Sequence, residues 1–82
     1  MTSLNPKVQP EPLAVDVSFL KNALRVVLAD GREIVVPLEW SPRLRKANSK
    51  QRKNWRLLGG GIGIHWPDVD EDLSVEGLLA LK

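Results

Sequence analysis

Three short stretches of this chain alternate apolar and polar residues, and this period of two predicts β-strands that each bury one face in a core. Their apolar positions are Val15, Val17 and Phe19, then Leu24, Val26 and Leu28, and then Ile34, Val36 and Leu38. A short turn is expected over residues 20–22. Asp30-Gly31 separates the second and third stretches and predicts a type I′ turn, which needs two residues at positive φ. The pattern indicates an antiparallel meander whose third strand ends, or lies at an edge, at Pro37.

Capping signals predict short helices after the meander. Ser41 supplies a capping hydroxyl, and Pro42 suits the first helical position, where no backbone donor is needed. Asn48-Ser49 interrupts the segment and caps a second piece, so the basic residues 43–56 are expected to form one or two short helical turns. Ser74 is expected to cap a last helix, whose apolar face consists of Val75, Leu78 and Leu79.

Between these helices, an apolar run contains four glycines, Gly59, Gly60, Gly61 and Gly63. The alternation around them predicts a single fourth strand, because glycine inside a strand indicates a bulge or the close approach of another backbone. The sequence therefore predicts an α+β fold. Its parts are a small antiparallel β-meander of three strands plus a bulged fourth, a short basic helical segment and a C-terminal helix.

The composition is typical of a small globular domain. The chain has 82 residues, and its 43% hydrophobic content separates it from disordered chains. It contains no cysteine, which excludes disulfides and thiolate metal sites. Residues 1–13 are interpreted as a flexible, proline-rich tail and residues 14–82 as one α+β domain. The sequence shows neither a secretory signal nor an apolar run of about 20 residues, so we expect a cytoplasmic protein that does not enter a membrane.

Opposite charges occupy separate parts of the chain. Residues 41–56 contain no acid and seven basic residues, Arg43, Arg45, Lys46, Lys50, Arg52, Lys53 and Arg56. Residues 68–76 contain no base and five acids, Asp68, Asp70, Glu71, Asp72 and Glu76. The basic residues, with Trp40 and Trp55 at their margins, could bind phosphates and stack a nucleic-acid base. They could equally form a solvated helix face, or bind an acidic partner protein or the acidic tract of another copy.

Motifs for catalysis or metal binding are weak. The glycine run lacks the Lys-Ser or Lys-Thr of a P-loop and the βαβ context of a dinucleotide fingerprint. His65 is the only histidine, whereas transition-metal sites normally use two or more His or Cys ligands. The acids from Asp68 onward leave a weak Mg²⁺ or Ca²⁺ site open, although they also suit a solvated flank before the last helix. Ser41, Ser49 and Ser74 are interpreted as helix caps, so no catalytic residue, cofactor or metal ligand is assigned.

Several motifs together resemble one bacterial protein family. They are DGREIVVPLEWSPRL at residues 30–44, QRKNW at residues 51–55, the glycine run, and HWPDVDEDLSVEGLL at residues 65–79. In combination they resemble domain of unknown function 2442 over residues 14–80. The basic character of residues 43–56 departs from that family's pattern.

The resemblance implies a small α+β domain, and the weak catalytic motifs lead us to expect a protein-binding module that is not an enzyme. Such domains are often encoded beside a small toxin-like protein, which implies the antitoxin-like half of a bacterial toxin–antitoxin-type pair with a cognate small protein as its partner. Aromatic residues and arginine are favoured interface anchors. The expected contact surface combines the charged tracts with Trp55, His65, Trp66, Asp68 and Asp70. The alternative is a nucleic-acid-binding module that uses residues 43–56, and a free strand edge could support a homodimer.

Overall fold

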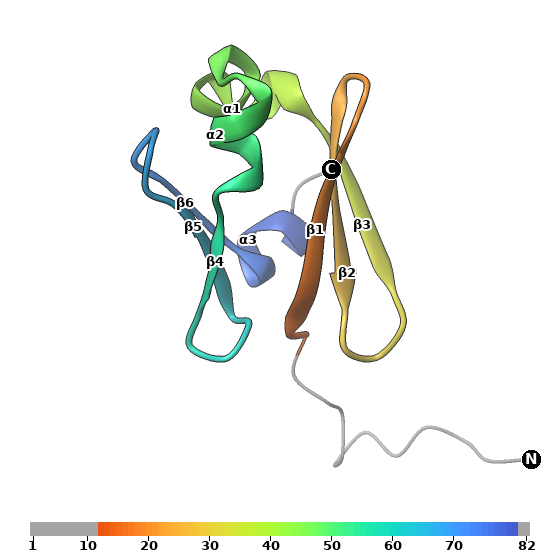
Figure 1. Cartoon of the computed structure of the whole chain (residues 1–82). Helices are drawn as coiled ribbons and strands as arrows, with labels where there is room; N and C mark the ends of the chain where they lie inside the picture. Colours follow the sequence, from red (N-terminus) through yellow and green to blue (C-terminus); the bar gives the residue numbers. More distant parts are fainter. Residues whose placement is uncertain (1–11, 81–82) are drawn as a thin grey trace, which may run out of the picture.

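Two antiparallel three-stranded sheets and several short helices form the fold, which a computed structural model describes for residues 12–80 (Figure 1). The strand orders are β1-β2-β3 and β4-β5-β6. The strands are β1 (Ala14–Leu20), β2 (Ala23–Leu28), β3 (Glu33–Pro37), β4 (Arg56–Leu58), β5 (Gly63–Trp66) and β6 (Glu71–Ser74). The helices are the 3₁₀ turn η2 (Leu38–Trp40), then α1 (Pro42–Lys46), α2 (Ser49–Lys53) and α3 (Val75–Ala80). The α+β class predicted from the sequence is confirmed.

The first sheet is the meander that the alternation predicts. Lys21 and Asn22 form the turn between β1 and β2, and Leu20 lies opposite Ala23. On β2, Leu24, Val26 and Leu28 are at most 1% exposed, as expected for the central strand of a sheet with one face in the core. β3 ends at Pro37, which cannot donate a hydrogen bond to a further strand.

The turn between β2 and β3 differs from the predicted type I′ turn. Gly31 has a positive φ of 93°, but Asp30 does not. The Leu28 N–H donates to the Arg32 carbonyl at 2.8 Å, and the Gly31 N–H donates to the Leu28 carbonyl at 3.0 Å. The loop therefore has three residues, in the arrangement of a type I turn followed by a glycine bulge. An Asp-Gly pair serves either loop length, so the pair alone did not fix the turn type.

The prediction that Val15 faces the core is wrong. Its side chain is 51% exposed, whereas Ala14 is fully buried. The register between β1 and β2 shifts between Ala14 and Asp16, so Val15 is an extra residue at a β-bulge. The extra residue reverses which alternate positions of the strand face the core. Ala14 and Val17, which are three residues apart, therefore both face it.

The prediction of one bulged fourth strand is also wrong, because the glycines reverse the chain. Gly59, Gly60 and Gly61 all have positive φ, and they form the turn between β4 and β5. β6 then pairs with β5, and Glu71 lies opposite Trp66. The acidic segment, expected to flank the last helix, instead forms the β5–β6 turn and part of β6. Two strands of three and four residues are too short for periodicity to distinguish them from one interrupted strand.

Gly61 joins the two sheets. The Ala14 N–H donates to the Gly61 carbonyl at 2.8 Å. A Cβ added to Gly61 would lie 2.5 Å from the Ala14 carbonyl oxygen, and the Gly61 φ of 119° disfavours any other residue. The close backbone approach predicted for the glycine run is therefore present at this position.

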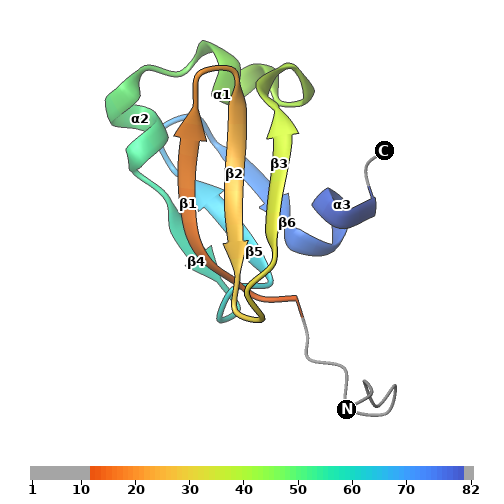
Figure 2. The same cartoon turned by 90° about the vertical axis from the view of Figure 1, so that its right-hand side faces the viewer.

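The core lies between the two sheets and is closed by α3 and α1 (Figures 1 and 2). Leu24 from the first sheet and Ile64 and Trp66 from the second are at most 1% exposed. Val75 and Leu78 contribute the buried face of α3. Apolar side chains from both sheets thus belong to one continuous cluster.

The predicted caps are confirmed, with two differences. The Ser41 hydroxyl accepts a hydrogen bond from the Leu44 N–H at 3.3 Å, and Ser74 accepts one from Gly77 at 2.9 Å. Asn48 is the cap of α2, so Ser49 is its first helical residue and not its cap. Leu79, expected on the apolar face of α3, is 40% exposed because only two positions of this one short helix meet the core.

The start of the chain is described only in part. Residues 1–11 of the predicted tail lie outside the described residues, as do residues 81–82. Leu13, the last residue of that tail, has a carbonyl that accepts a hydrogen bond from the Ala29 N–H at 2.8 Å. Within residues 12–80, no helix has the length and apolar composition needed to cross a bilayer.

Candidate functional site

A cleft of about 570 Å³ lies beside β1, on the side of that strand where α2 runs (Figure 2). Residues 17–21 line one wall with the end of β1 and the turn that follows it. The other wall comes from α2 and the residue before β4. Its lining residues are Ser49, Arg52, Lys53 and Trp55. Three of the residues that line the cleft are basic (Lys21, Arg52 and Lys53), and none of them is acidic.

The Arg52 side chain is held in place at this cleft. Its Nε donates to the Leu44 carbonyl at 3.0 Å, and its Nη2 donates to the Arg45 carbonyl at 2.9 Å. These carbonyls lie at the end of α1, where a cation also complements the helix dipole. The guanidinium carbon lies 5.4 Å from the centre of the Phe19 ring, which is within the range of a cation–π contact. A preorganised cation therefore spans from α2 to β1.

Two aromatic side chains, Phe19 and Trp55, line the cleft, and Phe19 also packs against the core. Phe19 meets Trp66 edge to face, with ring centres 6.3 Å apart and an angle of 73° between the planes. Trp66 is fully buried, and its Nε1 donates to the Arg52 carbonyl at 3.1 Å. Trp66 therefore belongs to the core and not to the contact surface expected from the sequence. Trp55 is half-buried and lines the cleft.

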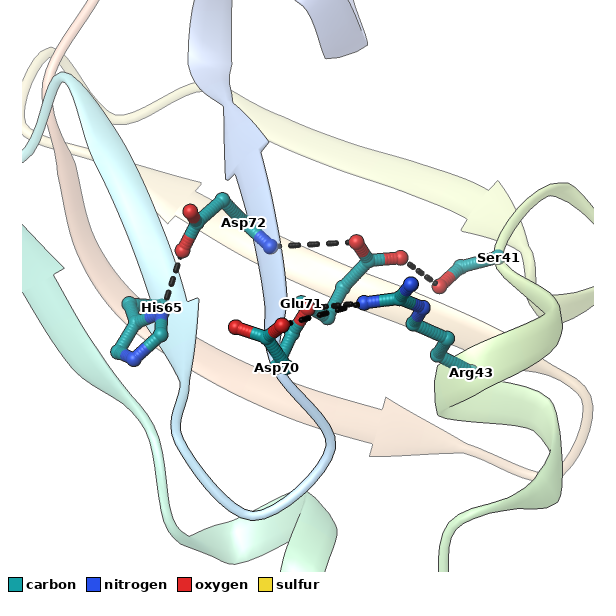
Figure 3. Close-up of polar contacts among 6 residues, drawn as sticks. All are labelled: Ser41, Arg43, His65, Asp70, Glu71 and Asp72. Carbon is teal, nitrogen blue, oxygen red and sulfur yellow. Dashed lines mark hydrogen bonds and ion pairs between the residues drawn. The ribbon is translucent and has the colours of Figure 1, made fainter.

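The acidic turn after β5 is engaged with the rest of the chain (Figure 3). Arg43 donates to the Asp70 carbonyl, and its Nη1 lies 3.8 Å from the Asp70 carboxylate. Asp68 accepts a hydrogen bond from the Asn54 side chain at 3.1 Å. Asp68 and Asp70 thus contact neighbouring segments of the same chain, and neither of them lines the cleft.

His65 lies on the outer face of the second sheet, opposite Asp72 on β6 and Arg56 on β4. Its Nδ1 contacts the Asp72 carboxylate (Figure 3). Trp55 packs against the core, on the other side of that sheet. The structure therefore does not bring Trp55 and His65 together into one surface.

The seven basic residues do not form one tract. Arg43 contacts Asp70, Arg52 binds carbonyls of α1, and Arg56 lies across from His65. Lys53 lines the cleft. The remaining exposed cations, on α1 and α2, are Arg45, Lys46 and Lys50.

Neither a metal site nor a catalytic constellation is assembled within residues 12–80. No three His, Asp or Glu side chains among them are grouped so that they could hold a metal ion. The His65–Asp72 pair has no described nucleophile in hydrogen-bond contact with it. The cleft presents two aromatic side chains, three cations and the edge of a strand.

The chain matches the family model described as "Protein of unknown function (DUF2442)" over residues 14–82. The chain belongs to this family. A crystal structure of a protein of unknown function from Rhodospirillum rubrum is similar to it, with 32% sequence identity and a TM-score of 0.74. The similarity covers 87% of this chain and 88% of the other. A search of curated proteins finds no match.

Sequence reasoning missed part of the cleft in this member of the DUF2442 family. Phe19 was predicted as a core residue, and Lys21 as part of a turn. Neither has a local sequence signal for binding, because the cleft exists only once residues 17–21 lie beside residues 49–55. The available signal was an amphipathic strand that ends next to a lysine, combined with a basic segment elsewhere in the chain.

Proposed function

We propose that this protein is a non-enzymatic protein-binding module that docks a cognate small protein at the cleft beside β1. The observation that carries this proposal is the lining of the cleft, where half-buried Phe19 and Trp55 lie among three cations. Aromatic residues and arginine supply most of the binding free energy at protein interfaces. A volume of about 570 Å³ also falls in the range of ordinary binding clefts.

The distribution of charge favours a protein over a nucleic acid. A nucleic-acid backbone presents phosphates at regular intervals, and its affinity comes from a track of cations that meets several of them. Here Arg43 is engaged by Asp70, and Arg56 lies on the second sheet beside His65 and Asp72. Acidic groups thus interrupt the basic segment in space. The nucleic-acid-binding module remains the alternative that the experiment below tests.

The family resemblance supplies the type of partner. We propose the antitoxin-like half of a toxin–antitoxin-type pair, whose partner is a small protein encoded beside it and met in the cytoplasm. Binding of this kind needs no catalytic group. The shape and charge of the cleft would determine which partner binds.

Two charge-reversal variants test the proposal. The protein is co-expressed with the product of the neighbouring gene, captured through a tag, and its complex is sized by light scattering. We expect a stoichiometric complex that is lost in the double variant Lys21→Glu and Lys53→Glu. The matched control is Lys46→Glu and Lys50→Glu, which makes the same change of charge on exposed residues that do not line the cleft.

Three outcomes contradict the proposal. Equal loss in both double variants would indicate a general charge effect and not the cleft. Absence of any captured protein would remove the cognate-protein proposal. Binding of duplex or single-stranded oligonucleotides, with an affinity that falls steeply as salt rises, would assign the basic residues to nucleic acid.

A further inference from the structure

β1 has the longest free edge among the strands of residues 12–80. It has seven residues, and β2 is its only partner strand. The Ala14 N–H at its start is bonded to Gly61, so the free edge begins after Ala14. At the opposite edge of the same sheet, β3 ends in Pro37 and contacts α3 (Figure 2). The edges of the second sheet are β4 and β6, which have three and four residues. A long unpaired edge is a template for another strand, which proteins normally cover or block.

The free backbone groups of β1 lie along the cleft. Leu20 and Ala23 flank a two-residue turn and form a hydrogen-bonded pair, and such pairs alternate along antiparallel strands. Phe19 and Val17, opposite Leu24 and Val26, therefore direct their N–H and C=O groups away from β2. Both residues line the cleft. The strand part of the lining, residues 17–20, spans about 14 Å in extended conformation, which matches about four residues of a guest strand.

The side chains around this edge favour a segment that carries acidic residues. Lys21 lies at one end of the lining segment, and Lys53 and Arg52 face it from α2. Arg52 uses two of its five N–H groups on the carbonyls of α1, so further donors remain on the same guanidinium. Phe19 and Trp55 offer apolar surface between the cations. A segment that alternates acidic and apolar residues would meet both kinds of surface, because its side chains alternate between two faces.

We propose that the cleft takes an extended acidic segment of the partner protein, which adds to β1 as a fourth strand of the first sheet. This deepens the proposed function and rests on it, because the segment belongs to the docked protein. A strand edge beside a helix is an established way to hold an extended peptide: main-chain hydrogen bonds give affinity, and side-chain pockets give specificity. Here the backbone of residues 17–19 would supply the main-chain hydrogen bonds. The side chains of Lys21, Lys53 and Trp55 would supply the specificity.

The test uses a synthetic peptide of about seven residues that alternates glutamate and valine. It is longer than the cleft-lining part of β1, so its central residues can pair there. Three control peptides are used. One replaces glutamate by lysine, and the other two carry N-methyl groups on the backbone nitrogens of one or the other set of alternate residues. The full chain labelled with ¹⁵N is titrated with each peptide. We expect the acidic peptide to shift the backbone amides of Val17 and Phe19, and the lysine peptide to shift neither.

Affinities then separate backbone pairing from charge. Because each backbone hydrogen bond contributes about fivefold to tenfold in affinity, we expect the peptide methylated in the pairing register to bind at least that much more weakly. The Lys21→Glu and Lys53→Glu double variant should also bind the acidic peptide more weakly, while Lys46→Glu and Lys50→Glu should retain it. Equal binding of methylated and unmethylated peptides, or shifts confined to the Trp55 indole, would overturn strand addition.

The same measurements keep this inference separate from the proposed function. Hydrogen exchange is measured on the complex with the neighbouring gene product, where strand addition protects the Val17 and Phe19 amides. A stoichiometric complex that leaves these two amides unprotected overturns the strand pairing but preserves the protein-binding function. Preferential binding of a thymidine oligonucleotide, or light scattering that shows protection arising from a second copy of this chain, would assign the edge to another occupant and overturn the inference.

Discussion

Ser41 donates a hydrogen bond from its hydroxyl to the Glu71 carboxylate at 2.7 Å, across 30 positions of the sequence (Figure 3). The same oxygen accepts the Leu44 N–H that begins α1. Glu71 in turn accepts a hydrogen bond from the Asp72 N–H at 3.1 Å. One buried hydroxyl therefore fixes the start of α1 against β6, and so links the two halves of the chain.

Replacement of Ser41 by alanine should lower the free energy of unfolding by about 1–2 kcal/mol, because it removes a helix cap and one of the two hydrogen bonds to the partly buried Glu71 carboxylate. Urea unfolding monitored by circular dichroism measures the change. Ser49→Ala is the control, since Ser49 is exposed and is the first residue of α2 without being its cap. Equal stability of the Ser41 variant and the native chain would show that the Ser41–Glu71 link does not contribute.

The glycines of the β4–β5 turn should differ in their tolerance of alanine. Gly61→Ala forces a Cβ within 2.5 Å of the Ala14 carbonyl oxygen at a φ of 119°, whereas Gly60→Ala meets nothing within 4 Å. We expect a loss of about 2–4 kcal/mol for Gly61→Ala and of about 1 kcal/mol for Gly60→Ala, which has only the cost of its left-handed backbone. Thermal unfolding of both variants measures the difference. Similar losses would contradict the close approach of β1 to this turn.

Trp66 and Trp40 should respond differently to the same substitution. Trp66→Phe leaves a void in the core and removes the donor to the Arg52 carbonyl, so it should destabilise the fold by about 2 kcal/mol or more. Trp40 is 46% exposed, and Trp40→Phe should change stability by less than about 0.5 kcal/mol. Denaturant unfolding of the two variants side by side is the measurement. The reverse order would contradict the assignment of Trp66 to the core.

Glu33 should make the stability of the first sheet depend on pH. The hydrogen bond from Arg25 at 2.8 Å, followed by the charge of Arg25, lowers the pKa of the Glu33 carboxyl below its usual value. A carboxyl with a lowered pKa contributes stability above its unfolded value of about 4.3, and this contribution is lost as pH falls through the folded pKa. Glu33→Gln should therefore be less stable than the native chain at pH 6 and nearly equal to it near pH 3.

Urea midpoints of both proteins across this pH range test the prediction, and 1 M salt should reduce the difference because the pair is exposed. The pKa of the Asp30 carboxyl is also lowered, first by the backbone N–H of Arg32 and then by the Arg32 side chain. Asp30 is present in both proteins, so its titration does not alter the comparison. A difference between Glu33→Gln and the native chain that stayed constant from pH 6 to pH 3 would contradict the Arg25–Glu33 pair.

The parts of the fold that follow from local rules were predictable. Alternation located β1, β2 and β3, and the capping residues Ser41, Asn48 and Ser74 located the starts of the helices. The predictions that were wrong concern features that depend on contacts between distant parts of the chain or on strand register. A single extra residue at Val15 inverts the faces of the strand around it, and nothing in the apolar pattern marks it.

The candidate site was less predictable than the fold. Sequence reasoning selected Trp66 for its residue type, but burial is decided by the packing of two sheets. Asp68 and Asp70 were selected for their charge, and their hydrogen bonds to Asn54 and Arg43 become visible only in three dimensions. Of the expected anchors, only Trp55 lines the cleft, together with Arg52 and Lys53 from the basic segment.

The topology has a consequence for how the chain folds. Every strand pair in residues 12–80 joins strands that are consecutive in the sequence, so each sheet needs only short loop closures, which favour rapid folding. Each meander can therefore form from local strand pairings, and the three short helices η2, α1 and α2 connect the two. Docking of the sheets through Trp66 and the Ala14–Gly61 bond is then the late, non-local step, and it is this step that creates the wall of the cleft facing β1.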